Sequence, residues 1–302
     1  MNTASCTSPS FLLTVDVEDW FQVENFKQWI PFSSWSQREL RVEKNTQSIL
    51  DLLDSVKDIT RQQPKATFFV LGWIAERLPG LVKEIHDRGH EVASHGYNHA
   101  LASAQGHNEL REDLVSSRTL LEDIIGAPVN GYRAPSFSIN NDVLKIIEEC
   151  GYLYDSSYNS FALHGRYGQA DLSGKPRAGA AIRMSESFYE LPISNITIGN
   201  RIFPLGGGAY FRLLPFPLFK FGIKRILNRD SAYLFYMHPW ELDPEQPRVS
   251  EACLSFKFRH YSNLKRTYSL LSGLLEHFSY CNFQTCARYI EKTAELSTKV
   301  LQ

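Results

Sequence analysis

Two patterns of apolar side chains alternate over the first 155 residues of the chain. Continuous apolar runs rich in β-branched residues are typical of strands buried on both faces, and they cover residues 11–16, 65–71, 91–94, 129–132 and 152–155. Apolar residues three or four positions apart are typical of amphipathic helices, and they cover residues 45–56, 75–88, 109–125 and 140–150. This alternation predicts an α/β fold in which crossover helices join parallel strands.

The second half of the chain is less regular. Residues 165–180 are rich in Gly, Arg, Lys and Pro, which predicts a surface loop, whereas 188–192 and 232–237 have the composition of strands. The glycine-rich turn 206–211 lacks the Lys-Ser/Thr pair of a phosphate-binding loop. The apolar stretch 211–226 is interrupted by prolines and lysines, so we expect it at most to lie on a surface.

Helical spacing near the C-terminus predicts two further helices, at 261–275 and 285–296. We expect them to pack against the outside of the barrel or to close its end. The chain therefore divides into a barrel at 1–245 and a C-terminal helical extension at 246–302. A length of 302 residues is within reach of a single α/β barrel.

Composition and charge narrow the class of protein. A net charge of -1 argues against a surface that binds polyanions, so nucleic acid is not an expected partner. The five cysteines have no CxxC spacing, which favours reduced thiols over a disulfide framework. The polar N-terminus does not resemble a secretory signal, and no apolar run reaches the roughly 18 residues that a membrane span needs. These features predict a cytoplasmic protein without a transmembrane segment.

Ionisable side chains follow the C-terminal ends of the predicted strands. They are Asp16, Glu18, Asp19, His95, His99, Arg133, Asp155 and His238. Barrels of this class place their chemistry at this edge of the sheet. Two imidazoles and one carboxylate make a set of metal ligands that leaves positions open for water and substrate, and a second acid and a third histidine remain for proton transfer. The pattern predicts metal-assisted hydrolysis without a covalent intermediate.

Two features have more than one interpretation. On one helical turn, His95 and His99 would point the same way and could share a metal; otherwise they are unrelated, one exposed and one packed. The aromatic residues between Trp20 and Trp35 form either a small satellite core or a platform for sugar rings.

Five segments stand in a fixed order along residues 11–241: TVDVED at Thr14–Asp19, SHGYNH at Ser94–His99, RAPSF at Arg133–Phe137, then Asp155 and FYMH at Phe235–His238. They resemble the successive motifs of the polysaccharide deacetylases, the NodB-homology enzymes of carbohydrate esterase family four. Segments 16–22, 206–215 and 237–241 resemble the subfamily of bacterial exopolysaccharide and exosortase gene clusters. The resemblance implies a distorted, incomplete TIM-like (β/α) barrel, a divalent metal, usually Zn²⁺, and removal of N-acetyl groups from amino sugars.

The resemblance also implies a role for each strand-end residue. Asp16 would be the general base, Arg133 would hold it ionised, and His95 and His99 would be metal ligands. His238 would protonate the departing amine, with Asp155 orienting it.

One departure concerns the adjacent pair of acids found in many family members, because Val17 follows Asp16 here. Either Glu18 or Asp19 must then supply the acidic ligand, with a slight preference for Glu18. Substrate contacts are expected from the five residues Trp20, Tyr97, Pro135, Phe137 and Trp240.

The favoured hypothesis is a metal-dependent N-deacetylase that acts on N-acetylhexosamine units of a polysaccharide or its precursor in exopolysaccharide biosynthesis. One alternative is an allantoinase-like amidohydrolase with a small amide as substrate. Another is a catalytically silent barrel that only binds carbohydrate.

Overall fold

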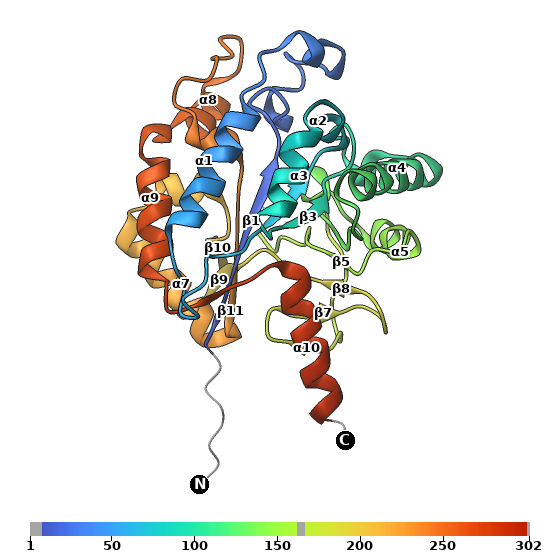
Figure 1. Cartoon of the computed structure of the whole chain (residues 1–302), viewed down its shortest axis with the longest axis vertical. Coiled ribbons are helices and arrows are strands. Elements are labelled where there is room, and N and C mark those ends of the chain that lie inside the picture. The colour runs from blue at the N-terminus through green and yellow to red at the C-terminus, as the bar shows by residue number, and fades with distance from the viewer. Residues whose placement is uncertain (1–7, 162–166, 301–302) are drawn as a thin grey trace.

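A curved sheet of mostly parallel strands organises the molecule (Figure 1). The computed structural model describes residues 8–161 and 167–300, with side chains through residue 295. The strand order is β11-β1-β2-β3-β4-β5-β8-β7-β6, parallel from β11 to β8 and antiparallel beyond it. Over the described residues the end strands β11 and β6 do not pair with each other, so the barrel is incomplete, as predicted.

The strands that carry the sheet are short. They are β1 (Ser10–Val17), β2 (Thr67–Val70), β3 (Glu91–Ser94), β4 (Gly131–Tyr132), β5 (Tyr154–Asp155), β6 (Arg177–Ala178), β7 (Ala181–Arg183), β8 (Tyr189–Glu190), β11 (Ala232–Met237) and β12 (Asn282–Phe283). A separate hairpin is formed by β9 (Asn195–Ile198) and β10 (Arg201–Pro204).

Helices connect and cover these strands. They are α1 (Val42–Ser55), α2 (Gly72–Arg77), α3 (Pro79–Asp87), α4 (His107–Ile125), α5 (Asn141–Glu149), α6 (Gly208–Leu213), α7 (Phe216–Asp230), α8 (Leu254–Tyr261), α9 (Leu264–His277) and α10 (Cys286–Val300). Single 3-10 turns include η4 (Pro135–Phe137) and η5 (Pro239–Leu242).

Successive residues of β1 point to opposite sides of the sheet, and this separates two apolar cores. Phe11, Leu13, Val15 and Val17 belong to the larger core between the sheet and its covering helices. Leu12 belongs to a smaller core inside the barrel. Thr14 and Asp16 lie two and four positions after Leu12, so they point to the same side of the sheet as Leu12 does. Strand β1 therefore presents Asp16 at the interior mouth of the barrel.

The C-terminal segment takes part in the sheet as well as covering it. Strand β12 pairs with β1, and Cys286, Tyr289 and Ile290 of α10 belong to the interior core. Helix α9 instead contributes Leu271 and Leu274 to the outer core. Figure 1 shows α10 beneath the sheet, at the end opposite to the strand tips. One C-terminal helix therefore packs outside the barrel and the other closes its end.

Several elements differ from the sequence-based prediction. The helix expected at 75–88 is two helices, because the chain turns at Leu78 before Pro79 begins α3. The stretch expected only to lie on a surface is helix α7, which buries Phe219, Ile223 and Ile226. Pro217 lies in its first turn, where a missing N–H is tolerated, so this proline starts the helix instead of breaking it.

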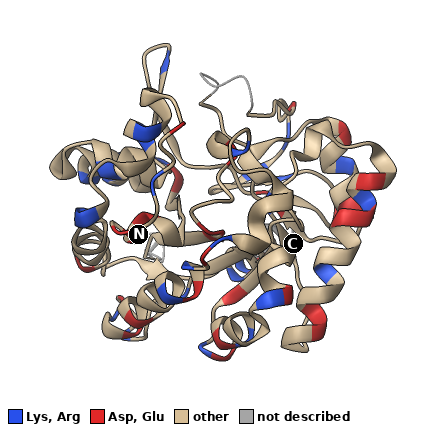
Figure 2. Ribbon diagram, turned by 90° about the horizontal axis from the view of Figure 1, so that it is seen from above, with Lys and Arg blue, Asp and Glu red and all other residues tan. Residues whose placement is uncertain are grey.

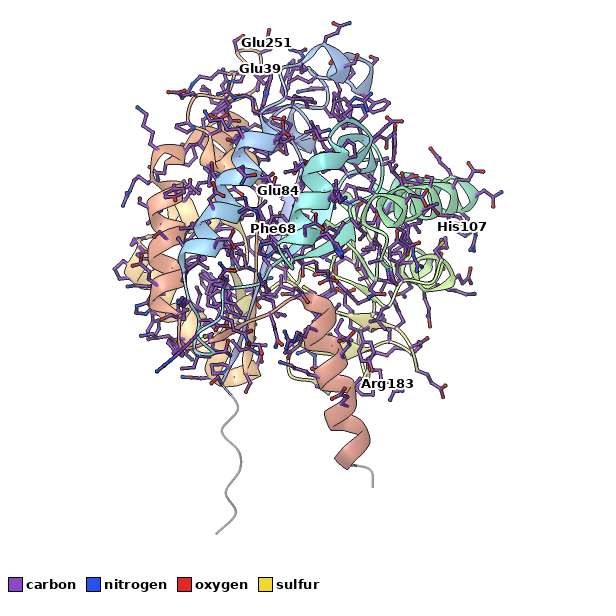
Figure 3. All side chains as sticks on the ribbon, in the orientation of Figure 1. Glu39, Phe68, Glu84, His107, Arg183 and Glu251 are labelled. Carbon is purple, nitrogen blue, oxygen red and sulfur yellow. The ribbon has the colours of Figure 1, made fainter. Side chains whose placement is uncertain are left out.

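The surface carries both signs of charge. Figure 2 shows acidic and basic residues interspersed over the outer helices. Figure 3 shows the side chain of Phe68 within the molecule, whereas His107 and Arg183 lie at its edge. Among the described residues, none of the helices is long and apolar enough to cross a membrane.

Candidate active site

The C-terminal ends of four parallel strands bring the candidate residues together. Asp16 lies near the end of β1, and His95, Arg133 and His238 directly follow β3, β4 and β11. The strand register holds these ends level, because Val15 pairs with Met237 and Ser94 pairs with Tyr132. Residues more than 200 positions apart in the sequence therefore surround one mouth of the barrel.

A buried ion pair fixes the carboxylate of Asp16. Nη1 of Arg133 donates to Oδ1 of Asp16 at 2.6 Å and to the hydroxyl of Thr14 at 2.8 Å. The other guanidinium nitrogens donate to the carbonyl and hydroxyl oxygens of Ser156. The guanidinium also lies 4.1 Å above the ring of Phe69. Arg133 is completely buried and cannot move without losing these contacts, so it holds the carboxylate of Asp16 in one orientation.

His95 and His99 share the site, but no helix carries them. The loop after β3 turns at Gly96 (φ 71°) and at His99 (φ 56°), both in the left-handed region. A side chain at Gly96 would also meet Asp113, at 2.8 Å from its carboxylate. This turn brings the two imidazole centroids to 5.5 Å. The interpretation as two unrelated histidines is therefore wrong, and the proposed helical turn is replaced by a strained loop.

The tautomer of His95 follows from its hydrogen bond. Nδ1 lies 2.7 Å from the carbonyl oxygen of Arg133, which can only accept, so Nδ1 carries the proton. Nε2 is then left with a lone pair. Burial lowers the pKa of both imidazoles, that of His99 to about 4 despite the neighbouring Glu18. Both rings are therefore neutral at pH 7.

The structure distinguishes the two acids that follow Val17. Glu18 is buried and places Oε2 at 3.2 Å from Nε2 of His99 and Oε1 at 3.0 Å from Nε2 of His238. Asp19 instead accepts from the backbone N–H groups of Trp20, Arg41 and Val42, at the start of α1. Asp19 thus caps a helix and does not join the histidines. Of the two candidates, Glu18 is the one at the site.

His238 is held between two carboxylates. Its Nδ1 lies 2.9 Å from Oε1 of Glu241, which also accepts from the backbone N–H of His238. Burial alone would lower the pKa of His238, but Glu18 and Glu241 raise it to about 10. Likewise, burial would raise the pKa of Glu18, but His99 and His238 lower it to about 2. His238 is therefore a cation that faces the carboxylates of the site.

The expected role of Asp155 needs a correction. Its carboxylate accepts from the backbone N–H and hydroxyl of Ser157 and adjoins Glu190, its register partner on β8. Burial raises the pKa of both carboxyls, and for Glu190 the charge of Asp155 raises it further. The carboxylate beside Nδ1 of His238 is that of Glu241. Glu241 belongs to the sequence motif at 237–241, for which no role of this residue was predicted. The available signal was the i, i+3 spacing of His238 and Glu241 in a turn that begins with Pro239.

A cavity of about 100 Å³ lies over these groups. Its walls include Asp16, Glu18, His95, His99, His238 and Glu241 together with Tyr167, Tyr236, Arg259 and His260. Two of the expected substrate-binding residues, Phe137 and Trp240, also line it. Ser136 and Phe137 have positive φ, 53° and 57°, so η4 enters the cavity with a strained backbone.

The other three expected substrate-binding residues lie elsewhere. Trp20 is buried and donates its indole N–H to the carbonyl of Glu39. The hydroxyl of Tyr97 donates to Glu76 outside the cavity, and Pro135 is buried at the start of η4. Trp20 also packs in edge contact with Phe21, which contacts Trp35 and Trp73. The aromatic segment is therefore mainly a satellite core.

The histidine and glutamate side chains at the cavity bear on whether a divalent metal fits there. Within residues 8–161 and 167–300, no group of three or more His, Cys, Asp or Glu side chains already surrounds a position for an ion. The donor chemistry is nevertheless suitable. Oε2 of Glu18 is a buried oxygen for which no hydrogen-bond donor is found among the described residues, and it lies beside a neutral imidazole. Two neutral imidazoles and one carboxylate are a common zinc donor set.

Comparisons with known proteins agree with this geometry. A family model described as polysaccharide deacetylase matches residues 35–154, and one described as a domain of unknown function (DUF3473) matches residues 156–288. A peptidoglycan-N-acetylglucosamine deacetylase of Bacillus cereus is 35% identical over 107 residues, which are 35% of this chain and 47% of the relative. A peptidoglycan deacetylase of Helicobacter pylori is 34% identical over 98 residues, 32% of this chain and 33% of the relative. The chain thus spans less than half the length of these curated relatives.

A solved structure supports the fold across the whole chain. A candidate polysaccharide deacetylase from Mycobacterium smegmatis superimposes with a TM-score of 0.61 at 18% identity, covering 98% of this chain and 94% of the other. The first family match contains His95, His99 and Arg133, and the second contains His238 and Glu241. Asp16 and Glu18 precede both, so each of these segments contributes to the site.

Proposed function

We propose that this chain, as a member of the polysaccharide deacetylase family, removes N-acetyl groups from amino-sugar units of a polysaccharide or of its precursor. The observation that carries the proposal is the opposed pair at the cavity: a carboxylate fixed by Arg133, and the imidazole of His238 with its Nε2 3.9 Å from the other oxygen of that carboxylate. Amide hydrolysis needs such a base and such an acid together, because the amine leaves only when protonated.

In this mechanism Asp16 accepts a proton from the attacking water as the water oxygen adds to the acetyl carbonyl carbon. Arg133 keeps the carboxylate pointed at the cavity through its 2.6 Å contact. The C–N bond then breaks and its electron pair passes to nitrogen, to which His238 delivers a proton. Nε2 of His238 lies 3.9 Å from Oδ2 of Asp16, so acid and base face the same small volume. The products are acetate and the free amine.

A divalent cation, Zn²⁺ in the first instance, is part of the proposal. His95, His99 and Glu18 are the residues that would hold it, since they offer two neutral imidazoles and a carboxylate oxygen without a hydrogen-bond donor. The cation would supply Lewis-acid polarisation of the acetyl carbonyl. The biological setting we propose is exopolysaccharide synthesis, on the basis of the segments DVEDWFQ, GGGAYFRLLP and MHPWE.

Acetate release from N-acetylglucosamine oligomers tests the proposal. We expect turnover that a chelator abolishes and Zn²⁺ restores, and a kcat about 10²–10⁴-fold lower in Asp16→Asn with the metal content unchanged. Ammonia release or ring opening of a small cyclic amide without acetate would instead indicate a small-amide hydrolase. Sugar binding that a chelator does not affect, with no acetate formed, would indicate a silent binding barrel.

A further inference from the structure

We propose that Glu241, held by Arg212, is the positioning residue that orients His238 for proton transfer to the leaving amine. This inference rests on the proposed function, and it gives Glu241 the role that the family resemblance assigned to Asp155. Oε1 of Glu241 lies 2.9 Å from Nδ1 of His238. Because a carboxylate accepts and does not donate, Nδ1 carries a proton and Nε2 is the nitrogen that faces the cavity.

Arg212 fixes the other end of Glu241. Its Nε donates to Oε2 at 2.7 Å, and its remaining nitrogens donate to the backbone carbonyls of Arg259, His260 and Ser262. Both side chains are almost fully buried. Since the guanidinium is anchored to the backbone, Glu241 is held between a fixed cation and the imidazole and has little freedom to turn away.

The glycine-rich turn explains how a carboxylate fits at this point. A side-chain carbon at Gly208 would lie 2.3 Å from Oε1 of Glu241 and 2.4 Å from Oε2, too close for any substituent. Gly208 thus makes room for Glu241, and Arg212 follows one turn later on α6. The motifs GGGAYFRLLP and MHPWE, which the sequence showed without a shared purpose, meet in this one contact.

The face of the imidazole is fixed as well as its edge. The ring of Trp240 stacks on His238 at 5.0 Å and 21°, and the ring of His260 stacks on Trp240 at 4.0 Å and 15°. Nε2 of His260 lies 2.6 Å from Oε1 of Gln246. With Glu241 at its edge and Trp240 on its face, His238 is limited to one orientation toward Glu18 and the cavity.

A purely structural role is the competing explanation, because Glu241 also caps the 3-10 turn η5 through the backbone N–H of His238. The leaving group separates the two. An amine must be protonated to leave, whereas the phenolate of p-nitrophenyl acetate leaves without a proton. If Glu241 positions His238, its substitution therefore slows hydrolysis of the amide only. If its role is purely structural, its substitution slows hydrolysis of both substrates.

The experiment compares Glu241→Gln with the wild type on N-acetylglucosamine oligomers and on p-nitrophenyl acetate. We expect kcat for the oligomer to fall about 10–100-fold with KM nearly unchanged, and the ester rate to change by less than about threefold. The control is Glu91→Gln, a half-buried carboxylate at the start of β3 that accepts hydrogen bonds from Thr67 and Tyr154, for which we expect an unaltered ratio of the two rates. A parallel loss on both substrates in Glu241→Gln, or no loss, overturns the proposal.

A second measurement does not depend on activity. In the wild type, ¹⁵N-resolved NMR should show the Nδ1–H of His238 as a low-field, slowly exchanging resonance, identified by its loss in His238→Gln. The double variant Glu241→Met/Arg212→Met removes the acceptor without leaving a buried unpaired charge, and the resonance should disappear. Its persistence in the double variant, or its absence from the wild type, overturns the positioning role. A wild type that releases no acetate but shows this resonance refutes the proposed function alone.

Discussion

Ionisable side chains at the barrel mouth form ion pairs. Because these pairs are buried, each charged group depends strongly on its partner. Arg133 and Arg212 are both buried, each with one carboxylate partner, Asp16 and Glu241. Removing one member of such a pair leaves an uncompensated charge and typically costs about 3–5 kcal/mol. Charge-neutralising substitutions at these positions therefore need the leaving-group and double-variant comparisons above to separate catalysis from stability.

The neighbours Glu18 and Asp19 should respond oppositely to the same change. Glu18→Gln removes a ligand oxygen, so we expect loss of bound Zn²⁺ by metal analysis and loss of acetate release. Asp19→Ala removes the acceptor for the N–H groups of Arg41 and Val42, so the free energy of unfolding in urea should fall by about 1–2 kcal/mol while metal is retained. Metal loss in Asp19→Ala with retention in Glu18→Gln would reverse the assignment.

A buried histidine away from the site gives stability a pH dependence. His90 is 3% exposed, its Nδ1 accepts from the N–H of Ala66, and burial lowers its pKa from 6.5 to about 3. As the pH falls, the imidazole of His90 takes up a proton in the unfolded chain before it does so in the folded protein. The free energy of unfolding therefore decreases below about pH 6.5, by up to about 1.4 kcal/mol per pH unit.

His90→Asn keeps an acceptor near Ala66 and removes the titration. Between pH 7.5 and 5.0 the wild type should therefore lose about 2 kcal/mol more of its unfolding free energy than the variant does, measured by urea denaturation. Equal losses in the two proteins would contradict a neutral buried His90.

Elements with an unambiguous apolar pattern were predictable from sequence, and those whose role depends on neighbours were not. Strands β3 and β11 have the predicted bounds: β3 lies between the parallel strands β2 and β4, and β11 pairs with β1 and is buried along its whole length. Helix α7 was missed because Pro215 and Pro217 resemble breakers until the helix start is known. At the site, Asp16, His95, His99 and His238 line one cavity, but the contact of Glu241 with His238 depends on side-chain distances that no spacing encodes.

Two helical glycines provide a test at the level of elements. In Gly208→Ala the new methyl group would displace Glu241, which Arg212 and His238 hold in place, so we expect about 1–3 kcal/mol of lost stability and reduced turnover. Gly80 in α3 has no atom within 4 Å of an added side-chain carbon, so Gly80→Ala should stabilise the protein by about 0.5–1 kcal/mol. Thermal unfolding and acetate release measure both; a harmless Gly208→Ala would show that Glu241 is not tightly held.

Three separate segments of the chain contribute side chains to the cavity. Residues 10–18 supply Asp16 and Glu18, the first matched family segment supplies two histidines and Arg133, and the second supplies His238 and Glu241. The predicted boundary at residue 245 stays a prediction. In the structure, Arg259 and His260 beyond it line the cavity, and Phe283 hydrogen-bonds to Asp58 and pairs with β1.

Truncation tests this integration directly. A chain that ends at residue 245 loses β12, the interior side chains of α10 and the carbonyls that hold Arg212, so we expect it to be largely unfolded. Near-UV circular dichroism and NMR dispersion at 25 °C measure this. A folded, active 1–245 fragment would show instead that the C-terminal segment is a dispensable addition.

The position of β1 in the sheet has a consequence for biosynthesis. Ser10 pairs with Ala232 in β11 and with Asn282 in β12, so β1 must wait for residues made much later. At about 5–20 residues per second, translation leaves its backbone edge unsatisfied for about 15–50 s. During that interval the nascent chain exposes an apolar strand beside the ribosome, where a holdase chaperone could bind it. The strand that carries Asp16 is thus synthesised early and is among the last to acquire its full set of neighbours.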